Sequence, residues 1–123
     1  MKSCPKPKIV PILILDDEPS ILKLMKRMLS RNGYAVDTTV NGEEGIRKIE
    51  RNEYSLILTD IKMPGISGNQ IFDHLRNKSK KSTPIIGMSG TPWLLNQSGF
   101  DAVLQKPSSQ KDMLDLIKRF AEK

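Results

Sequence analysis

Residues 55–68 read SLILTDIKMPGISG, an apolar run that stops at a single carboxylate and continues into a loop. The run Leu56–Leu58 is short and apolar, which predicts a strand buried on both faces of a sheet. Pro64 has no backbone N–H and Gly65 tolerates positive φ, so the strand cannot continue past them. Asp60 is therefore expected at the carboxyl end of a central strand, the edge at which open parallel α/β sheets bind ligands.

Strand-like and helix-like patterns alternate along the chain in five β–α units. Such alternation predicts a parallel sheet with right-handed crossovers and helices on both faces. The fourth helical segment, residues 92–97, is too short for more than a stunted helix. The helix that follows Asn41 has only Ile46 and Ile49 as an apolar stripe. The predicted strands are residues 9–15, 34–40 (a half-buried edge strand), 56–59, 84–88 and 102–105, and the other helices are expected at about 19–31, 42–51, 69–77 and 109–122.

The composition indicates one soluble globular domain. The chain has 123 residues, of which 37% are hydrophobic, and this suffices for a single core. No apolar run approaches the roughly 20 residues that span a bilayer, so no membrane partner is expected. A Pro- and Lys-rich arm, residues 1–7, precedes the expected domain at residues 8–122. Cys4 is the single cysteine, so no intrachain disulfide can form, and a reducing cytoplasm is the expected location.

The net charge of +6 raises the question of a nucleic-acid partner. The basic residues are scattered, however, and the densest clusters are at residues 6–8 and 76–81. No helix-turn-helix, RNA-binding strand or zinc-ligand pattern accompanies them. We therefore favour a solvated basic face and expect no direct contact with nucleic acid.

Four of the five predicted strands end in side chains that an apolar core would not hold. The ends of parallel strands lie at one edge of the sheet, so three acids, one hydroxyl and one cation are expected to converge there. The end of the second strand, near Val40, adds nothing obvious. The residues at the other four ends are Asp16 with Asp17, then Asp60, Ser89 and Lys106.

These residue types favour phosphoryl chemistry. Clustered carboxylates repel one another, and a hard divalent cation such as Mg²⁺ relieves the repulsion while keeping positions open for phosphoryl oxygens. Asp60 can then attack a phosphoryl group as a nucleophile and form an acyl phosphate. Lys106 would hold a second phosphoryl oxygen, and Ser89 would donate a hydrogen bond to a third.

Each residue also has a plainer explanation. Acids before a helix most often serve as an N-cap and complement the helix dipole. Ser89 alone is more often a turn residue, and Lys106 alone is more often a surface lysine. Asp60 is the hardest to explain in this way, because it closes an apolar strand. The joint pattern over four strand ends favours a functional site.

The same residues are similar to those of a known family. The chain resembles the receiver domain of bacterial-type two-component response regulators over residues 8–121. The resemblance implies a flavodoxin-like, doubly wound five-stranded sheet of order 2-1-3-4-5 with five helices, the fourth shortened here. The matching pieces are Asp16-Asp17-Glu18-Pro19, Thr59-Asp60-Ile61-Lys62-Met63-Pro64-Gly65, Met88-Ser89-Gly90 and Lys106-Pro107.

The resemblance implies a role for each acid. Asp60 looks like the phosphoacceptor, which receives its phosphoryl group from a histidine on a histidine kinase or a histidine phosphotransfer protein. Asp17 and Asp60 look like direct ligands of Mg²⁺ (or Mn²⁺), with the backbone carbonyl of Lys62 as a third. Asp16 would act mainly through a metal-bound water.

The remaining roles concern the response to phosphorylation. Ser89 is similar to the hydroxyl that moves toward the phosphoryl group, and Lys106 looks like the lysine that bridges to it. Lys106-Pro107 would be a cis peptide. Receivers usually carry Tyr or Phe three residues before this lysine, where this chain has Val103, and Ser89 lies closer to Lys106 than is usual. Signal transmission is therefore expected to be atypical.

The leading hypothesis is a signalling switch that acts through contacts with a downstream protein, as a monomer or weak dimer. It would promote its own dephosphorylation without turning over an external substrate. A metal-dependent phosphohydrolase is disfavoured, because Lys62 occupies the position where such enzymes carry a second acid. Two alternatives stay open: a receiver fragment of a hybrid histidine kinase or larger regulator, and a phosphorylation-independent interaction module. His74 is expected at the surface, without metal-ligating neighbours.

Overall fold

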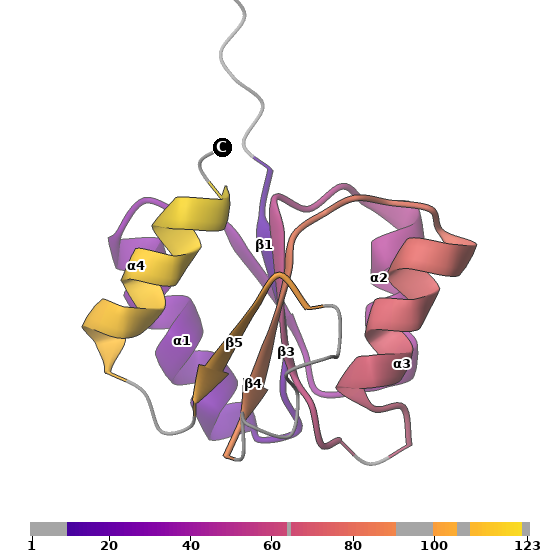
Figure 1. Ribbon diagram of the computed structural model, residues 1–123. Coiled ribbons are helices and arrows are strands. Elements are labelled where there is room, and N and C mark those ends of the chain that lie inside the picture. Colours follow the sequence, from indigo (N-terminus) through magenta and orange to yellow (C-terminus); the bar gives the residue numbers. More distant parts are fainter. Residues whose placement is uncertain (1–9, 64, 91–99, 106–108, 122–123) are drawn as a thin grey trace, which may run out of the picture.

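Five parallel strands form one sheet in the order β2-β1-β3-β4-β5. The computed structural model describes residues 10–63, 65–90, 100–105 and 109–121 (Figure 1). The order is the flavodoxin-like one that the resemblance to receiver domains implies. The elements are β1 Ile12–Leu15, α1 Pro19–Arg31, β2 Val36–Thr39, α2 Gly42–Arg51, β3 Leu56–Asp60, α3 Gly68–Asp73, the π-helical turn η1 His74–Lys78, β4 Ile85–Ser89, β5 Ala102–Gln105 and α4 Gln110–Ala121.

The sheet is covered on both faces. Figure 1 shows α1 and α4 on one side of the sheet and α2 and α3 on the other. Side chains alternate along each strand, so Ile12 and Ile14 pack with α1 and α4, while Leu13 and Leu15 pack with the α2 and α3 layer. Every residue of β1, β3 and β4 is buried, as expected for central strands of a parallel sheet.

The element boundaries differ from the sequence prediction in a few places. The first strand begins at Ile12 instead of residue 9, and Pro11 precedes it, with its carbonyl accepting the N–H of Ser55 at 2.9 Å. The strand before the loop extends to Asp60. The predicted helix at 92–97 lies outside the described residues. None of the described helices is both long and apolar enough to cross a membrane.

The third predicted helix, residues 69–77, consists of two different pieces. Helix α3 begins with a capping box, in which Ser67 accepts the N–H of Gln70 and the Gln70 side chain accepts the N–H of Ser67. After Asp73 the chain continues as η1, and the N–H of Ser79 donates to the carbonyl of His74 five residues earlier. Single π-helical turns of this kind interrupt α-helices often at functional positions.

Helix α2 approaches the sheet through glycines that the sequence analysis did not identify as a packing face. Gly42 and Gly45 are buried together with Ile49. A Cβ atom at Gly45 would overlap the end of the Leu15 side chain, and one at Gly42 would lie 2.7 Å from Cβ of Ile66. Helix α2 can therefore lie this close to Leu15 and Ile66 only because Gly45 and Gly42 have no side chains.

We expect the substitution Gly45→Ala to destabilise the protein, although alanine is the better helix former by about 1 kcal/mol. Leu15 is fully buried, so the added methyl group forces overpacking, and we expect a net loss of about 1–2 kcal/mol in the free energy of unfolding. Urea denaturation measures this difference. Arg47→Ala, at an exposed position of the same helix, is the control and should be close to neutral. A Gly45→Ala protein as stable as the control contradicts the packing argument.

Candidate functional site

Buried polar side chains collect at one edge of the sheet. Within the described residues, five polar or charged side chains are buried in the fold. Each lies at or directly after the carboxyl end of β1, β2, β3 or β4, whereas the rest of β1, β3 and β4 is apolar. Burial of a polar group costs free energy unless it is compensated, so their concentration at one edge marks a site and not general packing. These residues are Asp16, Thr39, Thr59, Asp60 and Ser89.

The strand register brings three of the sequence-predicted residues to the same level of the edge. Leu15 of β1 pairs with Thr59 of β3, so Asp16 and Asp60 follow at neighbouring positions. Asp60 in turn pairs with Met88 of β4, and Ser89 follows it. The exposed fractions of Asp16, Asp60 and Ser89 are 0%, 8% and 6%.

Backbone N–H groups orient the two buried acids. The Oδ1 atom of Asp16 accepts the N–H of Glu18 at 3.0 Å, and the N–H of Asp16 donates to the carbonyl of Thr39 at 3.2 Å. The Oδ1 atom of Asp60 accepts the N–H of Lys62 at 3.3 Å. Both carboxylates are therefore held by the loops that leave their strands.

The first acidic run forms a compact group of oxygens. One carboxylate oxygen from each of Asp16, Asp17 and Glu18 lies within 4.8 Å of the others. Glu18 occupies the N-cap position of α1, yet no side-chain hydrogen bond caps the helix there, so the plain capping explanation does not account for it. Such a donor set suits a hard divalent cation that prefers oxygen ligands. The sequence analysis quoted Glu18 in the acidic run but did not select it as a ligand.

Close backbone contacts fix the loop after Asp60. The N–H of Ile61 donates to the carbonyl of Met88 at 3.1 Å, and its carbonyl accepts the N–H of Gly68 at 3.0 Å. A Cβ atom at Gly68 would lie 2.8 Å from the carbonyl oxygen of Asp60, so only glycine lets α3 begin this close to the strand end. Gly65 has a φ of +82°, as the sequence predicts for the turn.

Thr39 is a site-edge residue that the sequence analysis missed, because the end of the second strand was expected to add nothing. Its hydroxyl donates to Oε1 of Glu44 at 2.7 Å and accepts the N–H of Asn41 at 3.2 Å. The Asn41 side chain caps α2 by accepting the N–H groups of Glu43 and Glu44. Thr39 therefore joins the edge of the sheet to the start of α2.

Two of the predicted site residues, Lys106 and Pro107, lie outside the described residues. Strand β5 ends at Gln105, which pairs with Ser89 of β4. Val103 is half-buried and pairs with Gly87 of β4. The side chain of Lys62 is exposed.

Two predictions about other polar residues need correction. His74 is not a surface residue: its side chain is 16% exposed, and Nε2 lies 3.6 Å from Oε1 of Glu50. The basic cluster at 76–81 is not wholly solvated either, because Arg76 and Lys81 turn back toward the fold. The ammonium group of Lys81 donates to the carbonyls of Ile49 and Asn52 at the end of α2. In both cases the partner belongs to α2, either the Glu50 side chain or the carbonyls at the end of the helix. The spacing of residues in the sequence does not reveal that α2 lies next to them.

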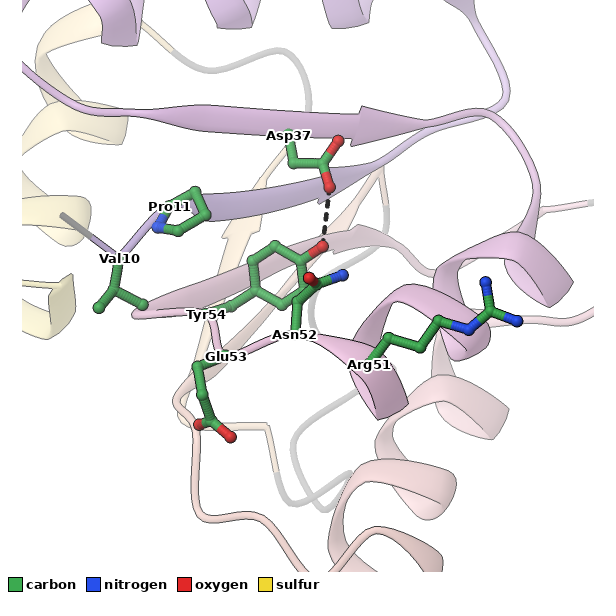
Figure 2. Close-up of a pocket in the computed structure, with 7 residues that line it drawn as sticks. All are labelled: Val10, Pro11, Asp37, Arg51, Asn52, Glu53 and Tyr54. Carbon is green, nitrogen blue, oxygen red and sulfur yellow. Dashed lines mark hydrogen bonds between the residues drawn. The ribbon is translucent and has the colours of Figure 1, made fainter. Parts of the chain in front are cut away.

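The opposite edge of the sheet carries a hollow of about 450 Å³ (Figure 2). In its wall the hydroxyl of Tyr54 donates to Oδ2 of Asp37 at 2.7 Å. Lys48 of α2 forms an ion pair with the same carboxylate at 3.1 Å. Burial and then the bond to Asp37 raise the pKa of Tyr54 far above its ordinary value. Burial also opposes ionisation of Asp37, but the bonds from Tyr54 and Lys48 outweigh it and lower the pKa of Asp37. This cluster fastens the start of β2 to the chain that enters β3.

The comparison with known sequences identifies the family. The sequence profile of the "Response regulator receiver domain" matches residues 12–118, which contain the sheet and the acidic edge. This chain belongs to the response regulator receiver domains. It is 36% identical over 112 residues to the transcriptional regulatory protein ResD of Bacillus subtilis, covering 87% of this chain and 46% of ResD. It is 31% identical over 113 residues to the protein PilG of Pseudomonas aeruginosa, covering 87% of this chain and 84% of PilG.

Solved structures support the same assignment. The response regulator TrrA of Thermotoga maritima, in complex with Mg²⁺–BeF, superposes with a TM-score of 0.82 at 33% sequence identity. The match covers 90% of this receiver domain and 98% of TrrA. This chain also spans only 7% of the Escherichia coli K12 sensor protein EvgS, to which it is 36% identical over 83 residues. The receiver domain thus corresponds to less than half of ResD and to a small part of EvgS.

We expect Tyr54→Phe to lower the free energy of unfolding at pH 7 by about 1 kcal/mol, because the partly exposed Asp37 loses one hydrogen-bond donor. The pKa of Asp37 in the folded state lies below its ordinary value of 3.8. The ionised Asp37 carboxylate therefore contributes fully to the free energy of unfolding above about pH 3.8. This contribution is lost as the pH falls through the folded-state pKa of Asp37. The difference in the free energy of unfolding between Tyr54→Phe and the wild type should therefore shrink below about pH 3.8.

Urea denaturation at a series of pH values measures this difference. Asp37→Asn is the companion variant, in which the acid dependence at this position should be absent. A Tyr54→Phe deficit that stays constant down to the acid limit would show that the hydroxyl does not act through the Asp37 carboxylate.

Proposed function

We propose that this receiver domain is phosphorylated on Asp60 and acts as a signalling switch. The observation that supports this most directly is a nearly buried carboxylate at the carboxyl end of the central strand, beside a second buried carboxylate, Asp16. Two buried acids at adjacent positions are costly unless a cation is bound between them. Receiver domains as a class are signalling domains and not turnover enzymes, and we place this chain with them.

The proposed step moves a phosphoryl group between two proteins. An oxygen of Asp60 attacks the phosphorus of a phosphohistidine on a histidine kinase or phosphotransfer protein, so an O–P bond forms and the N–P bond breaks. The electron pair of the broken bond stays on the histidine nitrogen, which takes up a proton. Asp60 then carries an acyl phosphate, which water can hydrolyse within the same site.

The oxygen-rich acidic run fits a Mg²⁺ or Mn²⁺ ion. We propose that Asp16, Asp17, Asp60 and the backbone carbonyl of Lys62 hold it, with Asp16 acting mainly through a water. When bound, the ion would neutralise the negative charge of the carboxylates and of the incoming phosphoryl oxygens. The backbone N–H groups of Glu18 and Lys62 would keep Asp16 and Asp60 in place during the reaction.

The remaining site roles follow the family pattern. Ser89 would donate its hydroxyl to a phosphoryl oxygen, and Lys106, with a cis bond to Pro107, would contribute a positive charge. Val103 takes the place of the usual aromatic residue, so we propose that the signal leaves the site by another route. The domain would comprise residues 8–122 behind an arm at 1–7.

The partners of the domain are part of the proposal. A histidine kinase or phosphotransfer protein would be the donor, and a downstream protein would read the phosphorylated state in the cytoplasm, with the receiver a monomer or weak dimer. The match to a small part of the sensor protein EvgS favours a second arrangement, in which this receiver works within a larger hybrid kinase. A phosphorylation-independent interaction module is the alternative if Asp60 does not react.

The test is intact mass spectrometry after incubation with a small phosphodonor such as acetyl phosphate. We expect the wild type to gain the mass of one phosphoryl group in the presence of Mg²⁺ and none when EDTA removes the metal. Asp60→Asn should gain none, and Asp16→Asn should react much more slowly. Asp115→Asn, at an exposed position of α4, is the control and should behave as wild type.

The outcome that would contradict the proposal is equally clear. A wild type that gains no mass and does not bind beryllofluoride has no working phosphoacceptor. Equal labelling of Asp60→Asn would place the reaction at another residue.

A further inference from the structure

A chain of packed side chains leads away from Asp60 along the α3 side of the sheet. It begins at Ile61, the next residue after Asp60, which is 7% exposed and has its backbone fixed on both sides by the bonds to Met88 and Gly68. Its side chain lies over Gly87 of β4, because a Cβ atom at Gly87 would be 2.7 Å from Cδ1 of Ile61.

Phe100 lies close to the same point above Gly87. The Cγ atom of its ring lies 3.4 Å from the position of that hypothetical Cβ atom. The side chains of Ile61 and Phe100 therefore share the space that a side chain at Gly87 would occupy. Val103 pairs with Gly87 but has only a short branched side chain and no ring. The aromatic ring next to Gly87 is that of Phe100.

The contacts continue from Phe100 to α3 and η1. The rings of Phe100 and Phe72 have centroids 5.3 Å apart with planes tilted by 49°, an arrangement that favours the pair. The guanidinium carbon of Arg76 lies 5.4 Å from the centroid of Phe72, within cation–π range. We call the series Ile61, Phe100, Phe72 and Arg76 the aromatic relay.

The relay ends on a group of bonds that hold the starts of β4 and β5. Nη1 of Arg76 donates to the carbonyls of Lys81 and Thr83 at 3.0 and 2.8 Å, and Nη2 donates to Oδ2 of Asp101 at 3.0 Å. The same oxygen of Asp101 accepts the N–H of Ile85 at 2.8 Å. A displacement of Arg76 would therefore alter the junction of η1 with both strands.

Phosphorylation would act directly on the first residue of the relay. The Oδ1 atom of Asp60 accepts the N–H of Lys62, and Ile61 lies between these two residues. An acyl phosphate has no carboxylate charge, so it is a weaker acceptor for that N–H, and it adds bulk at the strand end. The loop must readjust, and Ile61 is packed too tightly against its neighbours to absorb the change alone.

We propose that the aromatic relay transmits the phosphorylation state of Asp60 to the α3–η1 side of the domain and to the Arg76–Asp101 junction. This inference rests on the proposed function of Asp60. In this proposal the ring of Phe100 moves in response to the change at Asp60, and η1 is the element that is altered as a result. Phe72 lies between the two. The π-helical turn supplies a segment that can change its hydrogen-bond pattern when Arg76 moves.

The chain contains three phenylalanines, which makes fluorine NMR a sharp test. Protein labelled with 4-fluorophenylalanine gives one resonance each for Phe72, Phe100 and Phe120, assigned with single Phe→Leu variants. Phe120 packs with the α1 and α4 layer on the other face and is the internal control. On addition of Mg²⁺ and beryllofluoride we expect the Phe100 and Phe72 resonances to shift more than that of Phe120, and no such shift in Asp60→Asn.

A variant tests the order of the relay. In Phe100→Leu the Phe72 resonance should lose its response, whereas in Phe120→Leu, the same substitution on the opposite face, it should keep it. Arg76→Lys, which keeps the charge but loses the forked hydrogen bonds, should leave the response of Phe100 intact and weaken that of Phe72. Intact mass measured on each variant with acetyl phosphate confirms that Asp60 still reacts.

The possible failures are distinguishable. If Asp60 gains a phosphoryl group but Phe72 and Phe100 do not shift, or shift no more than Phe120, the relay is wrong and the proposed function stands. If Phe72 responds normally in Phe100→Leu, the signal does not pass through Phe100 and the relay is again wrong. If the wild type gains no mass, the proposed function and the relay both fall.

Discussion

The pairing of β1 with β3 is the constraint on which the site depends. Leu15 opposite Thr59 places Asp16 and Asp60 at adjacent strand ends, and the neighbouring pair Asp60 and Met88 adds Ser89. A slip of one residue in either register would turn these side chains to the opposite face of the sheet. The apolar runs of these strands oppose such a slip, because their alternate side chains fill two separate cores. Packing on both faces thus sets the geometry of the polar edge.

Much of this arrangement can be predicted from sequence. Continuous apolar runs identify β1, β3 and β4, and the alternation of strand and helix segments along the chain predicts a parallel sheet. The polar residues that end these strands indicate which edge of the sheet carries the site. The structure places Asp16, Asp60 and Ser89 at this edge, and their roles there stay predictions. Their placement can be predicted because it depends on the order of residues along a strand and on the direction in which parallel strands run.

The features that sequence did not predict depend on contacts between distant segments. Gly42 and Gly45 look like poor helix formers until the approach of Leu15 and Ile66 is known. The π-helical turn and the role of Arg76 depend on Asp101, which lies 25 positions away. Thr39 seemed an ordinary strand residue, and its bond to Glu44 needs α2 in place. Local sequence patterns carry no information about these distant partners. Helix and strand propensities alone therefore do not predict these features.

The position of β1 also matters before the fold exists. Both of its partners, β2 and β3, come later in the chain, so during synthesis the run ILIL remains without a covering strand or helix. Such a short, uncharged and strongly apolar run is a hazard for intermolecular strand pairing. It is bounded by Pro11, which cannot donate a backbone hydrogen bond, and by the charges of Asp16, Asp17 and Glu18. The acids of the polar edge thus stand where charged gatekeeper residues commonly flank an apolar strand and oppose its pairing with other chains.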